Sequence, residues 1–360
     1  MKKALVVDWL DKYGGAERVI SVLHKTFQFD EIYALANVMR EEDLAKIYQQ
    51  QPREIHTTFL QKFGKYFRSA FFLMHNQTEK LTVDKDVKLI VSSSHAVAKG
   101  IQKTTENQVH ISYFQARNFK YIWEDQDLYF GKWSKMLTPL IKRLQKKDIE
   151  QAQYPDYMIA NSHFVRQWIK EKYNRDSQVI YPPTDLHRFP LCQQKEDYYV
   201  AVGRLEPYKR FDIVVEAFNQ TGKKLVIIGD GSQKNKLRKS AGKNIVFTGF
   251  LNSDEVCSYM SKAKGFVHAG IEDFGITAVE AQSCGTPVIA FNQGGMKETI
   301  IEGKTGVTFS ETTPENLNQA LEQFEKLPFD YQAIHLHAQK FSEERFITEM
   351  KQFVEEVMNS

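Results

Sequence analysis

The chain of 360 residues is poor in cysteine and has no long apolar stretch. Its three cysteines, Cys192, Cys257 and Cys284, are odd in number, far apart and without metal-ligand spacing. A disulfide framework and a zinc site are therefore excluded as organising features, and we expect a reduced, cytoplasmic compartment. No apolar run approaches the roughly 20 residues that cross a bilayer. The opening run Ala4–Val7 ends at Asp8, unlike an export signal.

An excess of one charge is also lacking, since 48 Lys and Arg residues against 45 Asp and Glu residues give a net charge of only +3. This balance gives no reason to expect a nucleic-acid partner. Two segments without any acid stand out: residues 132–147 carry six cations, and residues 58–74 carry three cations and five phenylalanines. Each is interpreted as a basic amphipathic helix. We expect them either to lie on an anionic membrane surface, at the inner face of the cell membrane, or to pack an apolar stripe on the core.

Several catalytic signatures are absent as well. The chain has no Gly-x-Ser-x-Gly nucleophile elbow. Gly303-Lys-Thr305 lacks the earlier glycine of a phosphate-binding P-loop, because Glu298 stands in that position. Asp125-Gln-Asp127 lies among aromatic residues rather than at a clean strand end, so we expect no metal site there.

Short apolar runs alternate with helical patterns from residue 3 to 310, which is typical of parallel α/β architecture. The expected strands are residues 3–9, 31–36, 54–58, 89–94, 110–115, 157–161, 178–181, 198–204, 224–229, 244–249, 265–269, 287–291 and 306–309. The proline-rich run 181–197 predicts an interdomain linker. We expect two facing, doubly wound, Rossmann-like domains, 1–183 and 184–340, with a last helix in 341–360 packing back across the seam. A ligand would then sit in the cleft between them.

Two glutamates eight residues apart, Glu272 and Glu280, stand where a predicted strand turns into a helix that begins at Ile276. At about 100° per residue, this spacing leaves the two within roughly 80° of azimuth, so one ligand can contact both. The backbone N–H groups of Phe274, Gly275 and Ile276 form a helix start that suits phosphate or sugar oxygens. The alternative is two solvated acids on a helix.

Two cations follow the first expected strand of the second half. Arg204 closes the strand 198–204, and Lys209 follows in the next loop. One fork-shaped and one point charge are what a departing diphosphate needs, although a surface ion pair is the alternative. Gly229 opens Gly229-Asp-Gly231, which lacks the third glycine of the dinucleotide fingerprint and is weak alone.

The first half offers two features at its strand ends. Gly14 and Gly15 either let the backbone approach a ligand closely or make a plain tight turn. His95, past the strand 89–94, is a candidate proton relay or a structural histidine.

These motifs together resemble the retaining glycosyltransferases of family 4, which have the GT-B fold. The resemblance covers nearly the whole chain and rests on residues 14–18, 202–210, 229–231, 272–276 with Glu280, and 285–289. Residues 92–100, 180–185 and 341–346 resemble more narrowly the WbaZ-like branch of bacterial mannosyltransferases of O-antigen and polysaccharide assembly. The resemblance implies that Arg204 and Lys209 clamp the donor diphosphate and Glu280 binds the ribose. It further implies that Glu272, with the N–H groups of residues 274–276, holds the transferred sugar without a metal.

One segment departs from that branch, whose members commonly read Cys-His-Thr-Pro where this chain has Phe114-Gln-Ala-Arg117. Gln115 can hydrogen-bond a sugar hydroxyl but cannot carry charge as histidine can, and Arg117 adds a cation. The implied activity is hexose transfer from a nucleotide diphosphate sugar, GDP-mannose first, to a lipid-linked glycan in lipopolysaccharide synthesis. No other cofactor is expected. The alternatives are a GT-B sugar-nucleotide epimerase and a non-catalytic sugar-nucleotide binding protein.

Overall fold

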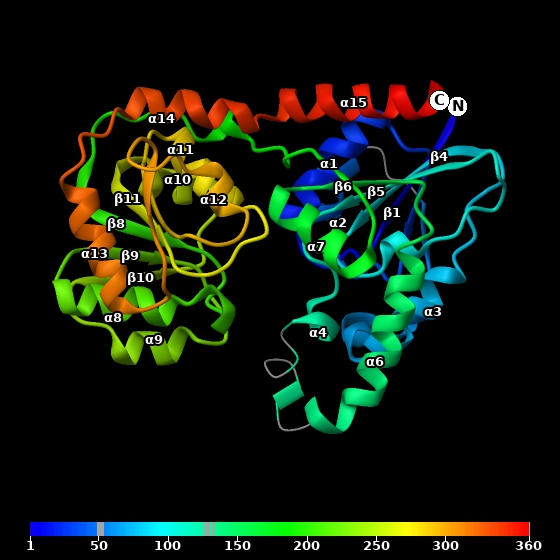
Figure 1. Ribbon diagram of the computed structural model, residues 1–360, viewed down its shortest axis with the longest axis horizontal. Helices are drawn as coiled ribbons and strands as arrows, with labels where there is room; N and C mark the ends of the chain where they lie inside the picture. The colour runs from blue at the N-terminus through cyan, green and yellow to red at the C-terminus, as the bar shows by residue number, and fades with distance from the viewer. Residues whose placement is uncertain (49–53, 125, 127–129, 132–133, 360) are drawn as a thin grey trace. The chain divides into compact units, whose positions relative to one another are not determined.

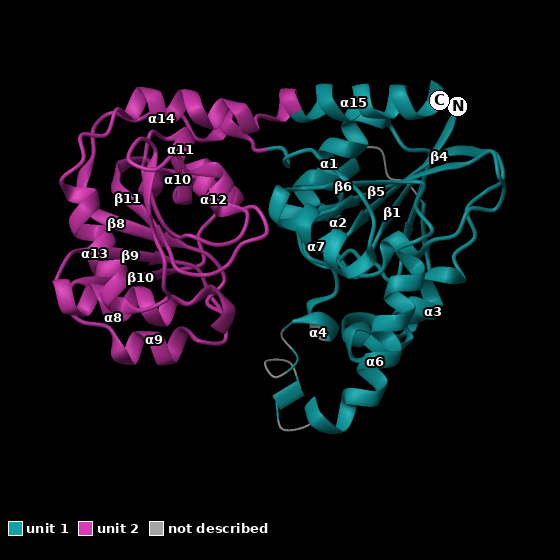
Figure 2. Cartoon of the chain, in the orientation of Figure 1, with its two compact units in different colours: residues 1–183, 346–360 teal, residues 184–345 magenta. Residues whose placement is uncertain are grey.

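The computed structural model describes residues 1–48, 54–124, 126, 130–131 and 134–359 (Figure 1). Asp125 and Asp127 lie outside this range. Two compact units divide the chain: unit 1 is Met1–Pro183 with Phe346–Ser360, and unit 2 is Thr184–Arg345 (Figure 2). Among the described residues, no helix has both the length and the apolarity that crossing a membrane demands.

Unit 1 is built on a sheet of seven strands in the order β3-β2-β1-β4-β5-β6-β7, in which every pairing is parallel. The strands are β1 Lys2–Val7, β2 Glu31–Ala34, β3 Ile55–Thr57, β4 Val87–Ser94, β5 Val109–Phe114, β6 Tyr157–Ala160 and β7 Gln178–Val179. The helices are α1 Gly15–Phe27, α2 Glu41–Tyr48, η1 Phe59–Leu73, α3 Met74–Glu79, η2 Ala98–Gly100, α4 Lys120–Trp123, α6 Ser134–Gln151, α7 His163–Tyr173 and most of α15 Glu343–Asn359.

Unit 2 is built on a six-stranded parallel sheet in the order β10-β9-β8-β11-β12-β13. The strands are β8 Glu196–Val202, β9 Leu225–Ile228, β10 Ile245–Gly249, β11 Ala263–His268, β12 Val288–Phe291 and β13 Gly306–Phe309. The helices are η4 Leu186–Arg188, η5 Pro207–Lys209, α8 Phe211–Thr221, α9 Lys234–Ser240, α10 Ser253–Lys262, α11 Ile276–Ser283, α12 Met296–Thr299, α13 Pro314–Glu325, α14 Tyr331–Ala338 and η6 Gln339–Phe341.

Each sheet is buried on both faces, because successive residues of a strand point to opposite sides. In β8, Tyr199 and Ala201 join the core beneath α8 and α13, whereas Val200 joins the core that includes α10 and α11. In β1, Leu5 and Ala4 divide between two cores in the same way. These continuous apolar runs explain why every strand predicted from the sequence is found, and the two Rossmann-like parallel-sheet domains are confirmed.

The strand orders create a topological switch point in each unit. In unit 1 the order reverses between β1 and β4, and in unit 2 between β8 and β11. At such a point the connections leave neighbouring strands toward opposite faces of the sheet, and a crevice opens at the carboxyl ends. The loops after these four strands carry most of the predicted site residues. The expected cleft between the domains stays a prediction.

One expected helix differs in form. Within residues 58–74, Phe59–Leu73 form η1, a 3-10 segment broken at Gly64 (φ 51°), rather than a straight amphipathic α-helix. The side chains that it buries are Leu60, Phe67 and Ala70. Gly64 adopts the left-handed conformation that glycine tolerates best, and this turn redirects the chain. Residues 134–147 of the second basic segment do lie in an α-helix, α6.

Candidate functional site

Two loops meet at the switch point of unit 2. One follows β8 and contains Arg204 and η5, and the other runs from β11 to α11. Their backbones touch at Gly270, where an added Cβ would lie 2.8 Å from the carbonyl oxygen of Tyr208 and 2.9 Å from the Cα atom of Lys209. Only glycine allows this approach. It brings Lys209 beside Glu272, although 63 residues separate them in the chain.

Lys209 and Glu272 form a hydrogen-bonded ion pair at this meeting point. Their side chains are 17% and 20% exposed, so the pair is largely but not wholly removed from water. The Nε2 atom of His268, at the end of β11, lies 3.2 Å from the same carboxylate oxygen of Glu272. Burial opposes ionisation of Glu272, but the Lys209 charge and His268 outweigh it and hold its pKa well below the ordinary value of 4.5. Glu272 is therefore a carboxylate at neutral pH.

The backbone of Glu272 is fixed from behind by a glycine pair. The N–H of Gly295 donates to the carbonyl oxygen of Glu272 at 2.8 Å, and Gly294 forms an isolated parallel bridge with it. A Cβ at Gly295 would lie 2.1 Å from the carbonyl oxygen of Asp273. A Cβ at Gly294 would lie 2.4 Å from the carbonyl oxygen of Glu272, so both positions require glycine and together they fix the backbone of Glu272.

The helix start beside Glu272 offers backbone donors. Gly275 is the N-cap of α11 with φ 95°, and no side chain caps the helix. The N–H groups of Gly275, Ile276 and Thr277 have no acceptor among the described residues. Because a helix start concentrates positive partial charge, these donors suit an anionic or sugar oxygen. Glu280 lies further along α11 and is 6% exposed, so it is not the solvated acid of the alternative interpretation.

Arg204 and Lys209 are linked through one aromatic ring. The Arg204 guanidinium donates to the Tyr208 hydroxyl at 2.7 Å, and the Lys209 ammonium lies 5.4 Å from the centre of the Tyr208 ring. Arg204 is otherwise exposed. Gly229 contributes by packing: a Cβ there would lie 1.9 Å from the carbonyl oxygen of Gly203, so Gly229 lets the two loops lie against each other.

The switch point of unit 1 gathers a second set of residues. Gly14 is the extended N-cap of α1 and Gly15 its first residue. The side chain of Glu17 accepts a hydrogen bond from the Gly14 N–H at 3.0 Å, which caps the helix start. The Gln115 amide donates to the carbonyl oxygen of Ala16 at 3.1 Å and to the Ser93 hydroxyl at 2.7 Å. Gln115 therefore ties α1 to β4.

Asp8 and His95 form a fixed dyad at the same switch point. Asp8 is 1% exposed, and its two oxygens accept hydrogen bonds from the four backbone N–H groups of residues 95–98. The Nδ1 atom of His95 lies 3.0 Å from the Asp8 carboxylate, while 30% of the imidazole side chain remains exposed. Trp9 meets the imidazole edge-on with ring centres 4.6 Å apart. Burial lowers the pKa of His95, but the charge of Asp8 outweighs it and raises this pKa above 6.5.

Arg117 does not gather with these residues. Its guanidinium lies 2.5 Å from the carboxylate of Glu124 and 4.7 Å from the ring centre of Phe164, and its side chain is 14% exposed. Within the described part of the chain, no three His, Cys, Asp or Glu side chains cluster as metal ligands would.

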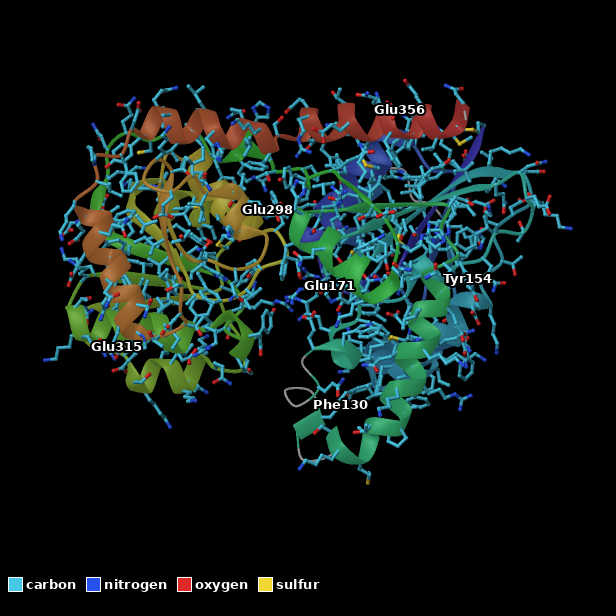
Figure 3. All side chains as sticks on the ribbon, viewed as in Figure 1. Phe130, Tyr154, Glu171, Glu298, Glu315 and Glu356 are labelled. Atoms are coloured by element: carbon cyan, nitrogen blue, oxygen red, sulfur yellow. The ribbon has the colours of Figure 1, made fainter. Side chains whose placement is uncertain are left out.

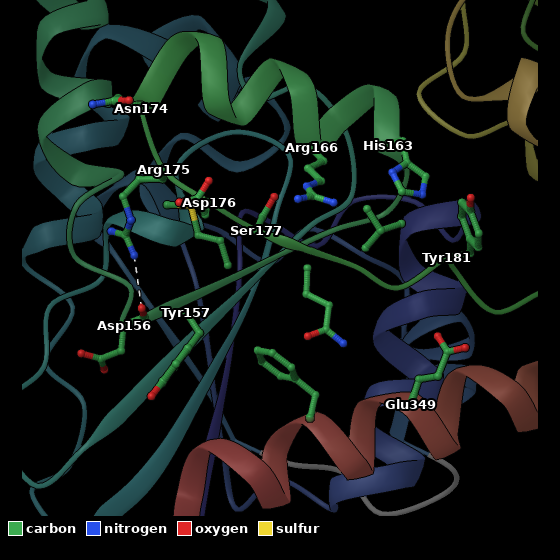
Figure 4. Close-up of a pocket in the computed structure, with 14 residues that line it drawn as sticks. Asp156, Tyr157, His163, Arg166, Asn174, Arg175, Asp176, Ser177, Tyr181 and Glu349 are labelled. Atoms are coloured by element: carbon green, nitrogen blue, oxygen red, sulfur yellow. Dashed lines mark hydrogen bonds between the residues drawn. The ribbon is translucent and has the colours of Figure 1, made fainter. Parts of the chain in front are cut away.

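A hollow of about 860 Å³ in unit 1 lies away from the switch point of that unit (Figure 4). It borders β7, the outermost strand, which β5 and β6 separate from β4. Arg175, at its rim, already donates to the carbonyl oxygens of residues 152, 153, 155 and 156. None of the predicted site residues lines this hollow, and it is not the candidate site.

Three residues of the candidate site escaped sequence reasoning: Asp8, Tyr208 and His268. The position of each residue in the sequence could have identified it. Asp8 directly follows β1 at a switch point, and His268 ends β11 four residues before Glu272. Tyr208 lies between the two candidate cations.

The comparisons with known proteins bear on unit 2 and on the fold. Residues 184–343 match the family model of glycosyl transferases group 1. An uncharacterized glycosyltransferase of Methanocaldococcus jannaschii is 30% identical over 173 residues, 46% of this chain and 48% of that protein. A GDP-mannose-dependent alpha-(1-6)-phosphatidylinositol monomannoside mannosyltransferase of Mycolicibacterium smegmatis is 29% identical over 140 residues, 34% of this chain and 37% of that protein. The chain thus spans about a third to a half of the length of these two curated relatives.

Solved structures are similar over nearly the whole chain. HepE of Anabaena, in complex with UDP, has a TM-score of 0.71 at 16% identity and covers 99% of this chain and 100% of its own. The lipopolysaccharide outer core galactosyltransferase WaaB, in its apo form, has a TM-score of 0.68 at 17% identity. The match covers 98% of this chain and 99% of WaaB. At such low identity the likeness shows the fold, which is that of GT-B glycosyltransferases. Membership of the group 1 family is thus supported by the match of residues 184–343, while the WbaZ-like branch stays a prediction.

Proposed function

We propose that this protein is a glycosyltransferase that moves a hexose from a nucleotide diphosphate sugar to a glycan acceptor. The single observation that carries the proposal is the fixed Lys209 and Glu272 pair beside the uncapped start of α11, at the switch point of the group 1 domain. A carboxylate, a cation and free backbone donors on one crevice edge match a ligand that is part sugar and part diphosphate.

Each group then has a task in the transfer. Lys209 and Arg204 stabilise negative charge on the departing diphosphate, and the N–H groups of Gly275 to Thr277 bind sugar or phosphate oxygens. Glu272 stabilises positive charge that develops on the sugar ring, and Glu280 binds the ribose hydroxyls. Because Lys209 is paired with Glu272, a bound donor would share the Lys209 ammonium between this carboxylate and its own phosphate. Sharing the Lys209 ammonium in this way would make the position of the Glu272 carboxylate depend on donor binding.

The reaction forms a bond between an acceptor oxygen and the anomeric carbon and breaks the bond from that carbon to the phosphate oxygen. The acceptor proton passes to the departing phosphate, with His95 as the relay on the acceptor side, and the nucleoside diphosphate leaves. We propose retention of the anomeric configuration by attack on the leaving-group face, without a metal. The two cations take the role that a metal has in other enzymes.

The donor and the acceptor are proposed from the resemblance and the relatives. Mannose from GDP-mannose is favoured because the Mycolicibacterium smegmatis relative is a GDP-mannose-dependent mannosyltransferase by name. UDP sugars are the second choice, since HepE was solved with UDP. The acceptor is proposed to be a lipid-linked glycan of bacterial surface polysaccharide synthesis, used at the inner face of the cell membrane.

Incubation with a panel of GDP and UDP sugars, with and without lipid-linked glycan acceptors, tests the proposal. Acceptor-dependent release of nucleoside diphosphate with a glycosylated product is the expected result. Formation of an epimer without acceptor would instead identify a sugar-nucleotide epimerase. Binding of a donor with neither product would identify a sugar-nucleotide binding protein.

A further inference from the structure

Large apolar side chains are exposed in one region of unit 1. Apart from Met1, all of the large hydrophobic residues that the described part of unit 1 exposes lie on η1 and α6. On η1 they are Phe59, Phe63, Tyr66 and Phe72, which are 52%, 40%, 67% and 45% exposed, and on α6 they include Met136 at 66%. Four such rings within one segment of 15 residues are more than scattered surface hydrophobics.

Exposed cations accompany these rings. Lys62 and Lys65 of η1, and Lys135, Lys142 and Arg143 of α6, are exposed. None of the five has an ion-pair partner among the residues that the structure describes. Two of them lie over neighbouring exposed rings: the Lys62 ammonium is 5.5 Å from the Phe59 ring centre, and the Lys65 ammonium is 5.3 Å from that of Tyr66.

Packing fixes which faces of η1 and α6 remain outside. The two elements share one core cluster, to which η1 contributes Leu60 and Phe67 and α6 contributes Ile141 and Leu144. Phe71 of η1 lies against Phe130, with ring centres 5.3 Å apart, near α6 (Figure 3).

A buried polar anchor holds α6 in this orientation. Asp148 is fully buried and accepts hydrogen bonds from Lys99 at 2.5 Å, Trp123 at 2.8 Å and Tyr173 at 2.6 Å. A carboxylate with three such partners cannot turn outward at low cost. The cationic face of α6 is thereby held toward solvent.

We propose that this η1–α6 surface, made of Phe59, Lys62, Phe63, Lys65, Tyr66, Phe72, Lys135, Met136, Lys142 and Arg143, docks on an anionic lipid bilayer. Aromatic rings partition into the interface between headgroups and acyl chains, and the adjacent cations are attracted to anionic headgroups. A second copy of the chain is a poor occupant, because the same cations would face each other. Single-stranded nucleic acid is less favoured because the chain as a whole is nearly neutral.

The surface also adjoins the switch point of unit 1. Arg68 of η1 forms an ion pair with Asp11 at 2.6 Å and lies over the ring of Trp9 at 5.0 Å. Trp9 in turn contacts His95. A bilayer bound at η1 would therefore hold lipid-linked glycans close to the candidate acceptor side. The docking itself does not depend on the proposed transfer.

Vesicle sedimentation with the full chain tests the docking. Wild-type protein should bind vesicles of phosphatidylcholine with 30% phosphatidylglycerol far better than vesicles of phosphatidylcholine alone, and binding should fall as salt rises. Lys62→Gln with Lys65→Gln should lower the partition coefficient about fivefold per charge. Phe59→Ser with Phe63→Ser should lower it by a similar or larger factor at every salt concentration.

Matched controls lie on unit 2. Phe250 is 81% exposed, and Lys236 and Lys239 are exposed on α9, so Phe250→Ser and Lys236→Gln with Lys239→Gln should leave binding unchanged. Equal losses in controls and surface variants, or no binding of the wild type at low salt, would overturn the proposal. So would single-stranded oligonucleotide displacing the vesicles at equimolar amounts. Transfer to a water-soluble acceptor should be unchanged in the surface variants, so a failed transferase assay and a failed docking assay are separate outcomes.

Discussion

Substitution of Glu272 is the most direct test of the proposed chemistry. Glu272→Gln keeps the shape of the side chain but removes the charge that stabilises a cationic sugar. We expect the turnover number to fall at least about 100-fold. Binding of nucleoside diphosphate should be retained or become tighter, because Lys209 is released from its carboxylate partner. Steady-state kinetics and titration calorimetry separate the two effects.

The matched control for that variant is Glu315→Gln, an exposed glutamate on α13 of the same unit (Figure 3). It should change neither turnover nor binding. A Glu272→Gln protein with wild-type turnover would remove Glu272 from the reaction.

His95 predicts a pH dependence whose sign follows from its contact with Asp8. Its pKa is raised above 6.5, and the proposed relay requires the neutral imidazole. Turnover should therefore fall as the pH decreases through this raised value, and His95→Gln should be slower and lose this acid limb. The effect on the free energy of unfolding has the opposite pH dependence. The pair of protonated His95 with Asp8 stabilises the fold fully below pH 6.5, and this contribution is lost as the pH rises through the raised pKa of folded His95. An unchanged acid limb in His95→Gln would exclude the relay.

Among the elements, the loops at the switch point of unit 2 depend on glycines that leave no room for a side chain. At Gly229, φ is 143° and a Cβ would lie 1.9 Å from the carbonyl oxygen of Gly203. We expect Gly229→Ala to lower the free energy of unfolding by about 2–4 kcal/mol. Gly222→Ala is the control, since φ is 67° there with nothing within 4 Å, and it should cost only about 1–2 kcal/mol. Urea unfolding followed by far-UV circular dichroism measures the free energy of unfolding of both variants. Equal losses in the two variants would contradict the packing argument.

The elements themselves could be predicted from the sequence because parallel strands buried on both faces appear as short apolar runs, as in β8 and β11. The start of α11 at Ile276 was likewise predictable from the turn residues before it. The pairing of Lys209 with Glu272 was not, because it depends on how two loops pack at Gly270. The form of η1 was also missed: periodicity fits an amphipathic helix, but one left-handed residue, Gly64, changes the path.

At the scale of the whole molecule, the chain passes between the units twice, after Pro183 and after Arg345. Unit 2 is one continuous segment with its own sheet, and one hydrophobic core lies on each face of that sheet. Unit 1 needs the last segment, because Phe346 and Met350 of α15 are fully buried in its main core. This asymmetry implies that the two units differ in their ability to fold alone.

We predict that a fragment of residues 184–345 folds and binds the nucleoside diphosphate of the true donor, since Arg204, Lys209, Glu272 and the start of α11 all lie within it. A fragment of residues 1–183 should aggregate, because loss of Phe346 and Met350 exposes apolar core, and adding residues 346–360 as a peptide should improve its solubility. Calorimetry and size-exclusion chromatography report both results. A folded 184–345 fragment without nucleotide affinity would contradict the assignment of donor binding to unit 2.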